Sequence, residues 1–181
     1  MNTVELECLI QCALSRVHAQ VCFLGVFAKD TIPHLSETLH YPVCFVVNSD
    51  PSNLPGTHWL AFYFISSSAC EFFDSYGLPP SFYHFNFLAH SNISCEYNKL
   101  VLQAFDSQVC GHYCAFFTMH RHSKSLDCII QTLYKRSNRD KYVFSVIQPL
   151  LPAKFVIQAH KSGACYSQCC KSRNNSTAIA P

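Results

Sequence analysis

The strongest constraint on the fold is a group of three short apolar runs that follow one another closely in the chain. They are VCFVV at 43–47, HWLAFYFI at 58–65 and CEFFD at 70–74, and each is rich in β-branched or aromatic residues, which favour strands. Turn-forming residues separate them, NSDPSNLPG at 48–56 and SSS at 66–68. Because short connections join strands that pair antiparallel, we predict a small, mainly antiparallel sheet.

Helical patterns lie on both sides of these strands. Residues 4–18 repeat apolar side chains at steps of about 3.6, as an amphipathic helix does. CGHYCAFFTMHRH, which begins at Cys110, is long enough for another helix, and residues 125–136 and 140–151 are further helical candidates. An early helix, a block of strands and later helices predict an α+β fold.

Two segments have weaker patterns. Residues 23–33, FLGVFAKDTIP, contain Gly25 and Pro33, which indicate a loop or an irregular segment. Residues 81–109 are hard to assign, although LVLQAF at 100–105 would suit a strand. The helices and strands above therefore carry the fold prediction.

The composition fits one folded domain. Of the 181 residues, 49% are hydrophobic and only 13% are charged, so the chain can bury a sizeable core and does not resemble a disordered protein. We expect a single domain over residues 1–160. Residues 161–181 lose hydrophobic periodicity and end in SRNNSTAIAP, which predicts a flexible tail.

The sequence argues against secretion and against a membrane anchor. MNTVELECLI lacks the basic start and apolar stretch of a secretory signal, and no apolar run approaches the ~20 residues that span a bilayer. The 12 cysteines are therefore expected to be mostly reduced thiols of an intracellular protein and not a disulfide framework.

Cys110 is the first candidate for catalysis. A cysteine becomes a nucleophile when its thiol is ionised, and a helix N-terminus favours the anion through unpaired N–H groups and the helix dipole. Cys110 stands where a helix is predicted to begin, and Gly111 after it would let a substrate backbone approach the sulfur. A Cys-Gly pair at a helix start also occurs without any catalytic role, so this feature needs partners.

The ends of two predicted strands supply those partners. A thiolate needs an imidazole to take its proton, and the imidazole needs an acceptor that fixes its tautomer. His58 begins one strand after a Pro-Gly turn, and Asp74 ends the next strand in FFDSYG. A hairpin would bring these two ends together. Each residue alone would be interpreted as a turn former, and their joint occurrence with Cys110 favours catalysis.

Acyl transfer also needs donors for an oxyanion, such as a side-chain amide and the N–H of the nucleophile. Gln103 and Gln108 both precede Cys110. Either of them could fold back over the helix start, and sequence physics does not choose between them.

Several motifs in this order, GTHWLAFYF, EFFDSYG and LQAFDSQVCGHYCAFF, resemble the adenovirus protease (adenain) family of cysteine endopeptidases. FLGVFAKDTIP and VVNSDPSNLPGTHW look like N-terminal signatures of its branch in Polinton/Maverick-type mobile elements, so that the resemblance covers residues 23–120. It implies a papain-like or adenain-like fold with the catalytic cysteine at the N-terminus of a central helix.

The resemblance also implies a role for each site residue. The family has a His, an acidic residue, a Gln and a Cys in this order, with the Gln seven positions before the Cys. Gln103 has this spacing and Gln108 does not. On this basis His58 is the general base, Asp74 orients it, Gln103 donates to the oxyanion and Cys110 is the nucleophile.

The implied substrates are viral or virus-like capsid precursor proteins, cut after small residues in Gly-Gly or Gly-x motifs. A groove walled by Trp59, with Gly111 beside the sulfur, would favour glycine because larger side chains would clash. The layout is also similar to that of deconjugating proteases for ubiquitin-like modifiers, in which a Trp follows the His as Trp59 follows His58. A catalytically silent homologue that acts as a binding protein is the alternative from another class.

The family further implies activators and a location. A short basic peptide activates such enzymes through a disulfide, for which Cys95 is the nearest candidate, with a buried or idle thiol as the alternative. DNA is a cofactor in adenovirus, and the basic region 121–141 could bind phosphates or be a solvated helix face. Its basic residues are Arg121, Lys124, Lys135, Arg136, Arg139 and Lys141. The implied location is the host nucleus and the virion, and we expect a monomer.

We predict no metal and no essential cofactor. The histidines His112, His120 and His122 have no complete ligand set around them in the sequence. The cluster of His160, Cys165, Cys169 and Cys170 has four possible zinc ligands, but its spacing matches no common zinc finger.

Overall fold

The computed structural model describes residues 1–35, 40–89 and 91–152. The strands are β1 (Cys22–Phe27), β2 (Val43–Asn48), β3 (Trp59–Ser66), β4 (Ala69–Phe73) and β5 (Ser94–Tyr97). The helices are α1 (Thr3–Arg16), α2 (Asn86–Ala89), α3 (Cys110–Arg121), α4 (Leu126–Tyr134) and α5 (Arg139–Ile147), with 3-10 turns η1 (Pro80–Tyr83) and η2 (Gln148–Leu150). The predicted α+β class is confirmed. Residues 153–160 of the expected domain and the expected tail 161–181 lie outside the described residues.

The five strands form one sheet in the order β1-β2-β3-β4-β5. The central strands β2, β3 and β4 pair antiparallel, as predicted. Both edge strands differ from the prediction, because β1 lies parallel to β2 and β5 lies parallel to β4. Each edge strand is joined to its neighbour by a long connection, which lets the chain return in the same direction.

Two sequence assignments were wrong. The segment 23–33 does not begin as a loop, because Cys22–Phe27 forms β1, with an irregular register around Gly25 at φ 131°. The edge strand is Ser94–Tyr97 and not LVLQAF at 100–105, which has no regular structure. Polar SCEY alternates half-buried and exposed side chains, so it lacks the apolar run by which the central strands are recognised.

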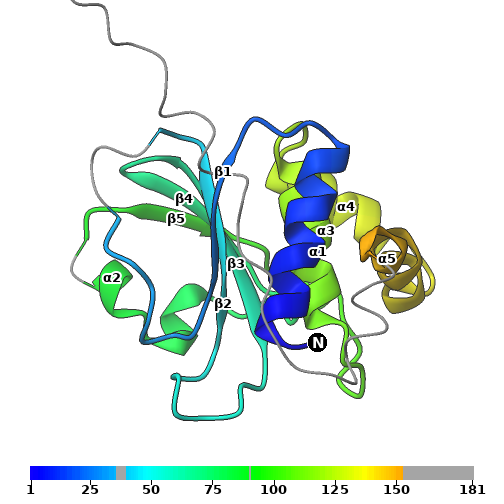
Figure 1. Ribbon diagram of the computed structural model, residues 1–181, viewed down its shortest axis with the longest axis horizontal. Helices are drawn as coiled ribbons and strands as arrows, with labels where there is room; N and C mark the ends of the chain where they lie inside the picture. The colour runs from blue at the N-terminus through cyan, green and yellow to red at the C-terminus, as the bar shows by residue number, and fades with distance from the viewer. Residues whose placement is uncertain (36–39, 90, 153–181) are drawn as a thin grey trace, which may run out of the picture.

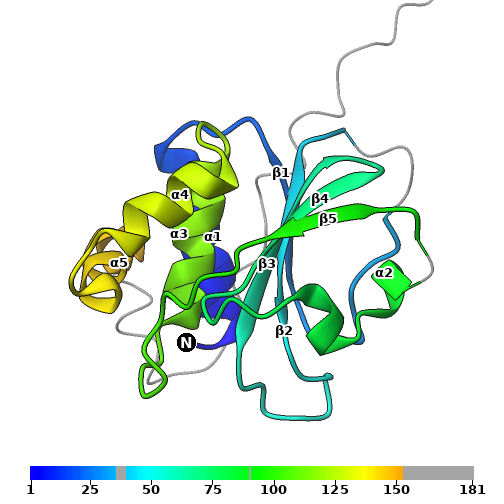
Figure 2. The same ribbon diagram turned by 180° about the vertical axis from the view of Figure 1, so that it is seen from behind.

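The sheet is the middle of three layers (Figures 1 and 2). Helices α1, α3, α4 and α5 cover one face, and α2 with η1 lies on the other. Both faces bury an apolar cluster, so every residue of β2 is buried. The cluster under the helices contains Val46, Ala61, Tyr63 and Phe73 of the sheet. The opposite cluster contains Phe45, Phe62, Phe64 and Phe72, against which Tyr83 and Phe85 pack.

Helix α3 is the central helix of the helical layer. It packs against β3, α1 and α5, and most of its residues are buried. Cys110 is its first residue, which confirms the expected cysteine at the N-terminus of a central helix. Among the residues that the structure describes, no helix has the length and apolar character needed to cross a membrane.

Candidate active site

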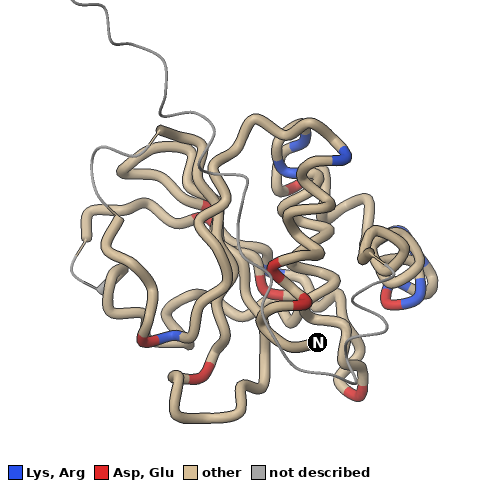
Figure 3. The backbone as a smooth tube through the Cα atoms, viewed as in Figure 1, with Lys and Arg blue, Asp and Glu red and all other residues tan. Residues whose placement is uncertain are grey.

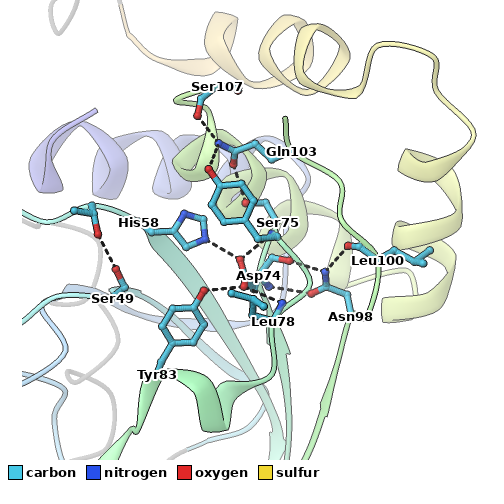
Figure 4. Close-up of polar contacts among 12 residues, drawn as sticks. Ser49, His58, Asp74, Ser75, Leu78, Tyr83, Asn98, Leu100, Gln103 and Ser107 are labelled. Carbon is cyan, nitrogen blue, oxygen red and sulfur yellow. Dashed lines mark hydrogen bonds and ion pairs between the residues drawn. The ribbon is translucent and has the colours of Figure 1, made fainter. Parts of the chain in front are cut away.

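Three predicted residues meet at one end of the sheet. His58 directly precedes β3, Asp74 directly follows β4, and Cys110 opens α3. Because β3 and β4 are antiparallel, with Ala61 opposite Phe73, the beginning of β3 lies beside the end of β4. Figure 4 shows the His58 ring pointing at the Asp74 carboxylate.

The Asp74 carboxylate is completely buried and fully engaged. Its Oδ1 accepts hydrogen bonds from His58 Nε2 at 2.7 Å and from the Tyr76 N–H at 2.9 Å. Its Oδ2 accepts from the Leu78 N–H at 3.1 Å and from the Tyr83 hydroxyl at 2.8 Å. These donors compensate the burial of a charge and fix the plane of the carboxylate.

The bond to Asp74 also fixes the tautomer of His58. A carboxylate only accepts, so Nε2 carries the proton and Nδ1 is the basic nitrogen of the neutral ring. Nδ1 is buried, and no protein group in the described ranges makes a hydrogen bond of normal geometry with it. It is therefore the nitrogen available to exchange a proton with the Cys110 thiol.

The electrostatics of the site favour a charged pair. Burial is the largest influence on both groups and opposes charge, since it lowers the pKa of His58 and raises the pKa of Cys110. Hydrogen bonding to Asp74, and interaction with the Cys110 thiol, outweigh burial and raise the pKa of His58 to about 9. The His58 ring, with the N–H groups of Trp59 and Gly111, lowers the pKa of Cys110 from its ordinary value. These shifts favour a thiolate beside an imidazolium.

Gln103 is buried beside this pair, with 2% of its surface exposed. The Ser75 hydroxyl donates to its Oε1 at 2.8 Å, and its Nε2 donates to the Ser107 carbonyl at 2.7 Å and to the Tyr76 hydroxyl at 3.3 Å (Figure 4). Because a backbone carbonyl only accepts, these contacts assign the amide nitrogen to the side of Ser107. Gln108 is exposed, so the two glutamines differ in burial, and the choice of Gln103 as the oxyanion donor stays a prediction.

A cleft of about 620 Å³ opens over these residues. Its walls include His58, Trp59, Tyr76, Gln103 and Cys110, together with the loop at 50–57. The cleft therefore brings Cys110, His58 and the two glutamines, Gln103 and Gln108, to one surface.

Gly111 also lines this cleft, but its immediate surroundings are protein. A Cβ built there would lie 3.0 Å from Met1 Sδ and 3.4 Å from both Leu6 Cδ1 and Trp59 Cδ1. Close packing of α1 and Trp59 against α3 therefore accounts for the glycine, in addition to any room it leaves for a substrate.

Several residues of the site had not been predicted. Tyr76 stacks on the His58 ring, with centroids 4.6 Å apart, and the 83% exposed Phe105 stacks on Tyr76. The Asn98 side chain makes two hydrogen bonds with the Asp74 backbone: it accepts from the N–H at 2.9 Å and donates to the carbonyl at 2.6 Å. Tyr76 could have been found in the turn DSYG, whereas Asn98 follows a strand that the sequence did not reveal.

Cys95 lies away from these groups, on the edge strand β5. It is half-buried and stands directly opposite Cys70 of β4. A hydrogen bond from the Cys70 thiol lowers the pKa of Cys95 from its ordinary value. The role predicted for Cys95, a disulfide with an activator, stays a prediction.

The arginines of the basic region 121–141 are engaged within the protein. Arg121 forms an ion pair with the buried Glu71 and lies over the Tyr63 ring, 4.9 Å from its centroid. Arg136 lies over the Tyr142 ring at 4.3 Å, and Arg139 donates to the Leu102 carbonyl at 2.9 Å. Figure 3 places most basic residues over the helical layer. Nucleic-acid binding there stays a prediction.

In the part of the chain that the structure describes, no three His, Cys, Asp or Glu side chains are grouped to hold an ion. His112 bonds to Gln148 Oε1 at 2.7 Å, and His120 bonds to the Phe116 carbonyl at 2.9 Å. The cluster that begins at His160 lies outside the described residues.

Comparisons with known proteins agree in fold. No family model matches the chain, and no curated protein matches its sequence. The crystal structure of the ASFV pS273R protease is similar, with a TM-score of 0.54 and 16% identity over 81% of this chain and 66% of that chain. The central domain of the uncharacterized Lpg1148 protein from Legionella pneumophila is also similar, with a TM-score of 0.52 and 12% identity over 86% and 98% of the two chains. At these identities the likeness shows a shared fold, one that a viral protease uses.

Proposed function

We propose that this protein is a cysteine endopeptidase that uses Cys110, His58 and Asp74. The observation that carries this function is the buried contact between His58 and Asp74 at 2.7 Å. Asp74 raises the pKa of the His58 ring, and this ring lies beside the Cys110 thiol at the N-terminus of α3. This arrangement prepares a thiolate and a proton donor in the same cleft. The shared fold with the ASFV pS273R protease supports the same class of reaction.

The proposed reaction has two stages, acylation and deacylation. The Cys110 thiolate attacks the scissile carbonyl and forms a carbon–sulfur bond, while the carbonyl electron pair moves onto the oxygen. His58 gives its Nδ1 proton to the departing amine, which leaves a thioester on Cys110. Water then attacks the thioester as His58 takes its proton, and the acid product and the thiolate are released. Asp74 keeps the ring oriented and stabilises its charge in both steps.

The oxyanion would be held by two donors, the N–H of Cys110 and Nε2 of Gln103. The amide is already oriented by the Ser75 hydroxyl and the Ser107 carbonyl. Its bond to the Tyr76 hydroxyl is the longest of the three contacts, at 3.3 Å, and is the one that a substrate oxyanion would replace.

The substrates that fit this proposal are capsid precursor proteins of a virus or virus-like element, cut after Gly-Gly or Gly-x. The resemblance of the motifs and the likeness to a viral protease fold support this class. Trp59 would exclude large side chains next to the cut. Removal of a ubiquitin-like modifier is a second candidate, because it is the same chemistry on a different acyl donor.

The test compares the wild type with Cys110→Ala on Gly-Gly peptides, candidate capsid precursors and a ubiquitin-like modifier fused to a tail. A basic peptide and DNA are each added or omitted, since both are possible activators. Cys128→Ala is the matched control, because Cys128 is an exposed thiol on α4. We expect the wild type and Cys128→Ala to cleave the substrate and Cys110→Ala to be inactive. Cleavage that survives Cys110→Ala would reject the mechanism, and inactive wild type under all conditions would favour a silent binding protein.

A further inference from the structure

The backbone on both sides of Gln103 is held by residues from distant elements. The N–H groups of Leu102 and Gln103 donate to the Ser75 carbonyl at 2.9 and 3.1 Å. On the other side the Leu102 carbonyl accepts from Arg139 Nε at 2.9 Å, and the Ala104 N–H donates to Asp140 Oδ2 at 3.2 Å. Hydrogen bonds thus hold the backbone on both sides of Gln103, the residue that carries the proposed oxyanion donor.

The second oxygen of Asp140 connects this segment to the nucleophile helix. Oδ1 accepts from the Tyr113 hydroxyl at 2.8 Å, and Tyr113 is a completely buried residue one turn after Cys110 in α3. The same hydroxyl also lies 3.1 Å from the Leu102 carbonyl oxygen. Because a hydroxyl has one proton, Tyr113 shares it between this carbonyl and Asp140. Asp140 therefore joins the helix of Cys110 to the loop of Gln103 by one carboxylate.

The loop that follows Gln103, residues 104–106, is exposed, so the bond between Ala104 and Asp140 matters for its stability. Gln103 is buried, but Ala104, Phe105 and Asp106 are exposed, and Phe105 is the most exposed large apolar residue described. Segments with exposed backbone and few buried contacts open locally at small cost. Without the bond from Ala104 to Asp140, local opening of the exposed loop would reach Gln103.

We propose that Asp140 is a positioning residue of the peptidase reaction, which holds Gln103 in register with Cys110 so that both oxyanion donors face one carbonyl. This inference rests on the proposed function. A donor contributes fully to an oxyanion hole only when it is fixed before the reaction, and loss of one such donor typically lowers kcat by about 10²- to 10³-fold. Asp140 touches no substrate and acts only through its bonds to the Ala104 N–H and the Tyr113 hydroxyl.

The kinetic test is a double-mutant cycle on a Gly-Gly peptide with Asp140→Ala, Gln103→Ala and the combined variant. We expect Asp140→Ala to lower kcat by about 10-fold or more with KM changed less than about 2-fold, because an interaction of the transition state is lost. The combined variant should be no slower than Gln103→Ala alone. Losses that multiply would overturn the inference, since Asp140 would then act independently of Gln103.

Asp127→Ala is the matched control. Asp127 is also an acidic residue in the first turn of a helix, α4, but it is exposed and lies away from the cleft lining. It reproduces the loss of charge and of the helix-dipole contribution. The rate of Cys110 alkylation by iodoacetamide should be unchanged in Asp140→Ala and Asp127→Ala, because this reaction needs the thiolate and no oxyanion donor.

Hydrogen exchange separates this inference from the proposed function. In Asp140→Ala the amides of residues 102–104 should exchange faster than in the wild type, with α3 and the Asp127→Ala control unchanged. If the wild type cleaves no substrate, the proposed function fails while the exchange result still decides whether Asp140 positions Gln103. Equal exchange at 102–104 would reject the positioning role whatever the activity.

Discussion

The His58 ring and the Asp74 carboxylate meet at 2.7 Å although 16 positions separate them in the chain. Their contact follows from the antiparallel pairing of β3 and β4, which places the start of one strand beside the end of the other. Asp74 is completely buried, and donors from Tyr76, Leu78 and Tyr83 hold its oxygens. The ring therefore has one orientation, which leaves Nδ1 for Cys110.

Asp74→Asn should remove the charge of the carboxylate with little change in the size of the side chain. Without the carboxylate, its hydrogen bond and its charge no longer oppose burial, so the pKa of His58 would fall from about 9 and the imidazolium would be less favoured. We expect kcat to fall by about 10²- to 10⁴-fold, the range of general acid–base catalysis. Steady-state kinetics on a Gly-Gly peptide would measure this, and an unchanged kcat would remove Asp74 from the mechanism.

His58→Ala should change the pH dependence of Cys110 alkylation. In the wild type His58 lowers the pKa of Cys110, so the thiolate persists below the ordinary pKa of a thiol. Without the ring, burial raises the pKa of Cys110, and the midpoint of the iodoacetamide reaction should move to higher pH. Mass spectrometry of the Cys110 peptide at a series of pH values would show the shift. A midpoint that moves down or stays in place would contradict the ion pair.

Sequence patterns found His58, Asp74 and Cys110 because each stands where a regular element begins or ends, and turn residues mark such places. The choice of Gln103 needed the family resemblance, since its burial depends on Ser75 and the 100–109 segment. Asn98 and Asp140 had no local signal at all. They reach the site from β5 and α5, and only the packed fold brings those elements to it.

The same limit applied to the sheet. The central strands were recognisable because both of their faces are buried and their sequences are mostly apolar, with Glu71 of β4 as a charged exception. β1 contains Gly25, which has a positive φ and lies where the register with β2 shifts. In the sequence alone, a glycine at this place is typical of a loop. β5 is a short edge strand with exposed alternate residues, so its pairing with β4 depends on the tertiary structure.

Tyr83→Phe should destabilise the protein without removing any charged group. The Tyr83 hydroxyl donates to Asp74 Oδ2 at 2.8 Å in a buried setting, and hydrogen bonds to charged groups contribute about 1.5–3 kcal/mol. Urea unfolding should show a loss of that size. Tyr134→Phe is the control, because Tyr134 is half exposed and a Phe ring still packs under Arg139; a change within about 0.5 kcal/mol is expected there. Equal effects of the two variants would refute the role of Tyr83.

Arg121→Ala should also destabilise the protein, because it leaves the Glu71 carboxylate buried and unpaired. Loss of one partner of a buried pair costs about 3 kcal/mol or more in the free energy of unfolding. Lys124→Ala is the matched control, since only its backbone carbonyl contacts Arg121. If DNA binds the region 121–141, Lys124→Ala should weaken binding while Arg121→Ala acts through stability. A stable Arg121→Ala variant would show that the ion pair is dispensable.

Cys95 should form an intramolecular disulfide with Cys70 under mild oxidation. The two residues stand opposite each other on β4 and β5, and the lowered pKa of Cys95 favours it over Cys70 as the attacking thiol. It would attack oxidised glutathione and release one reduced glutathione, and Cys70 would then displace the second. Peptide mass spectrometry should show loss of two hydrogens in the wild type and not in Cys95→Ser. A lasting glutathione adduct on Cys95 would instead favour the activator disulfide, because Cys70 would then be unable to compete for that sulfur.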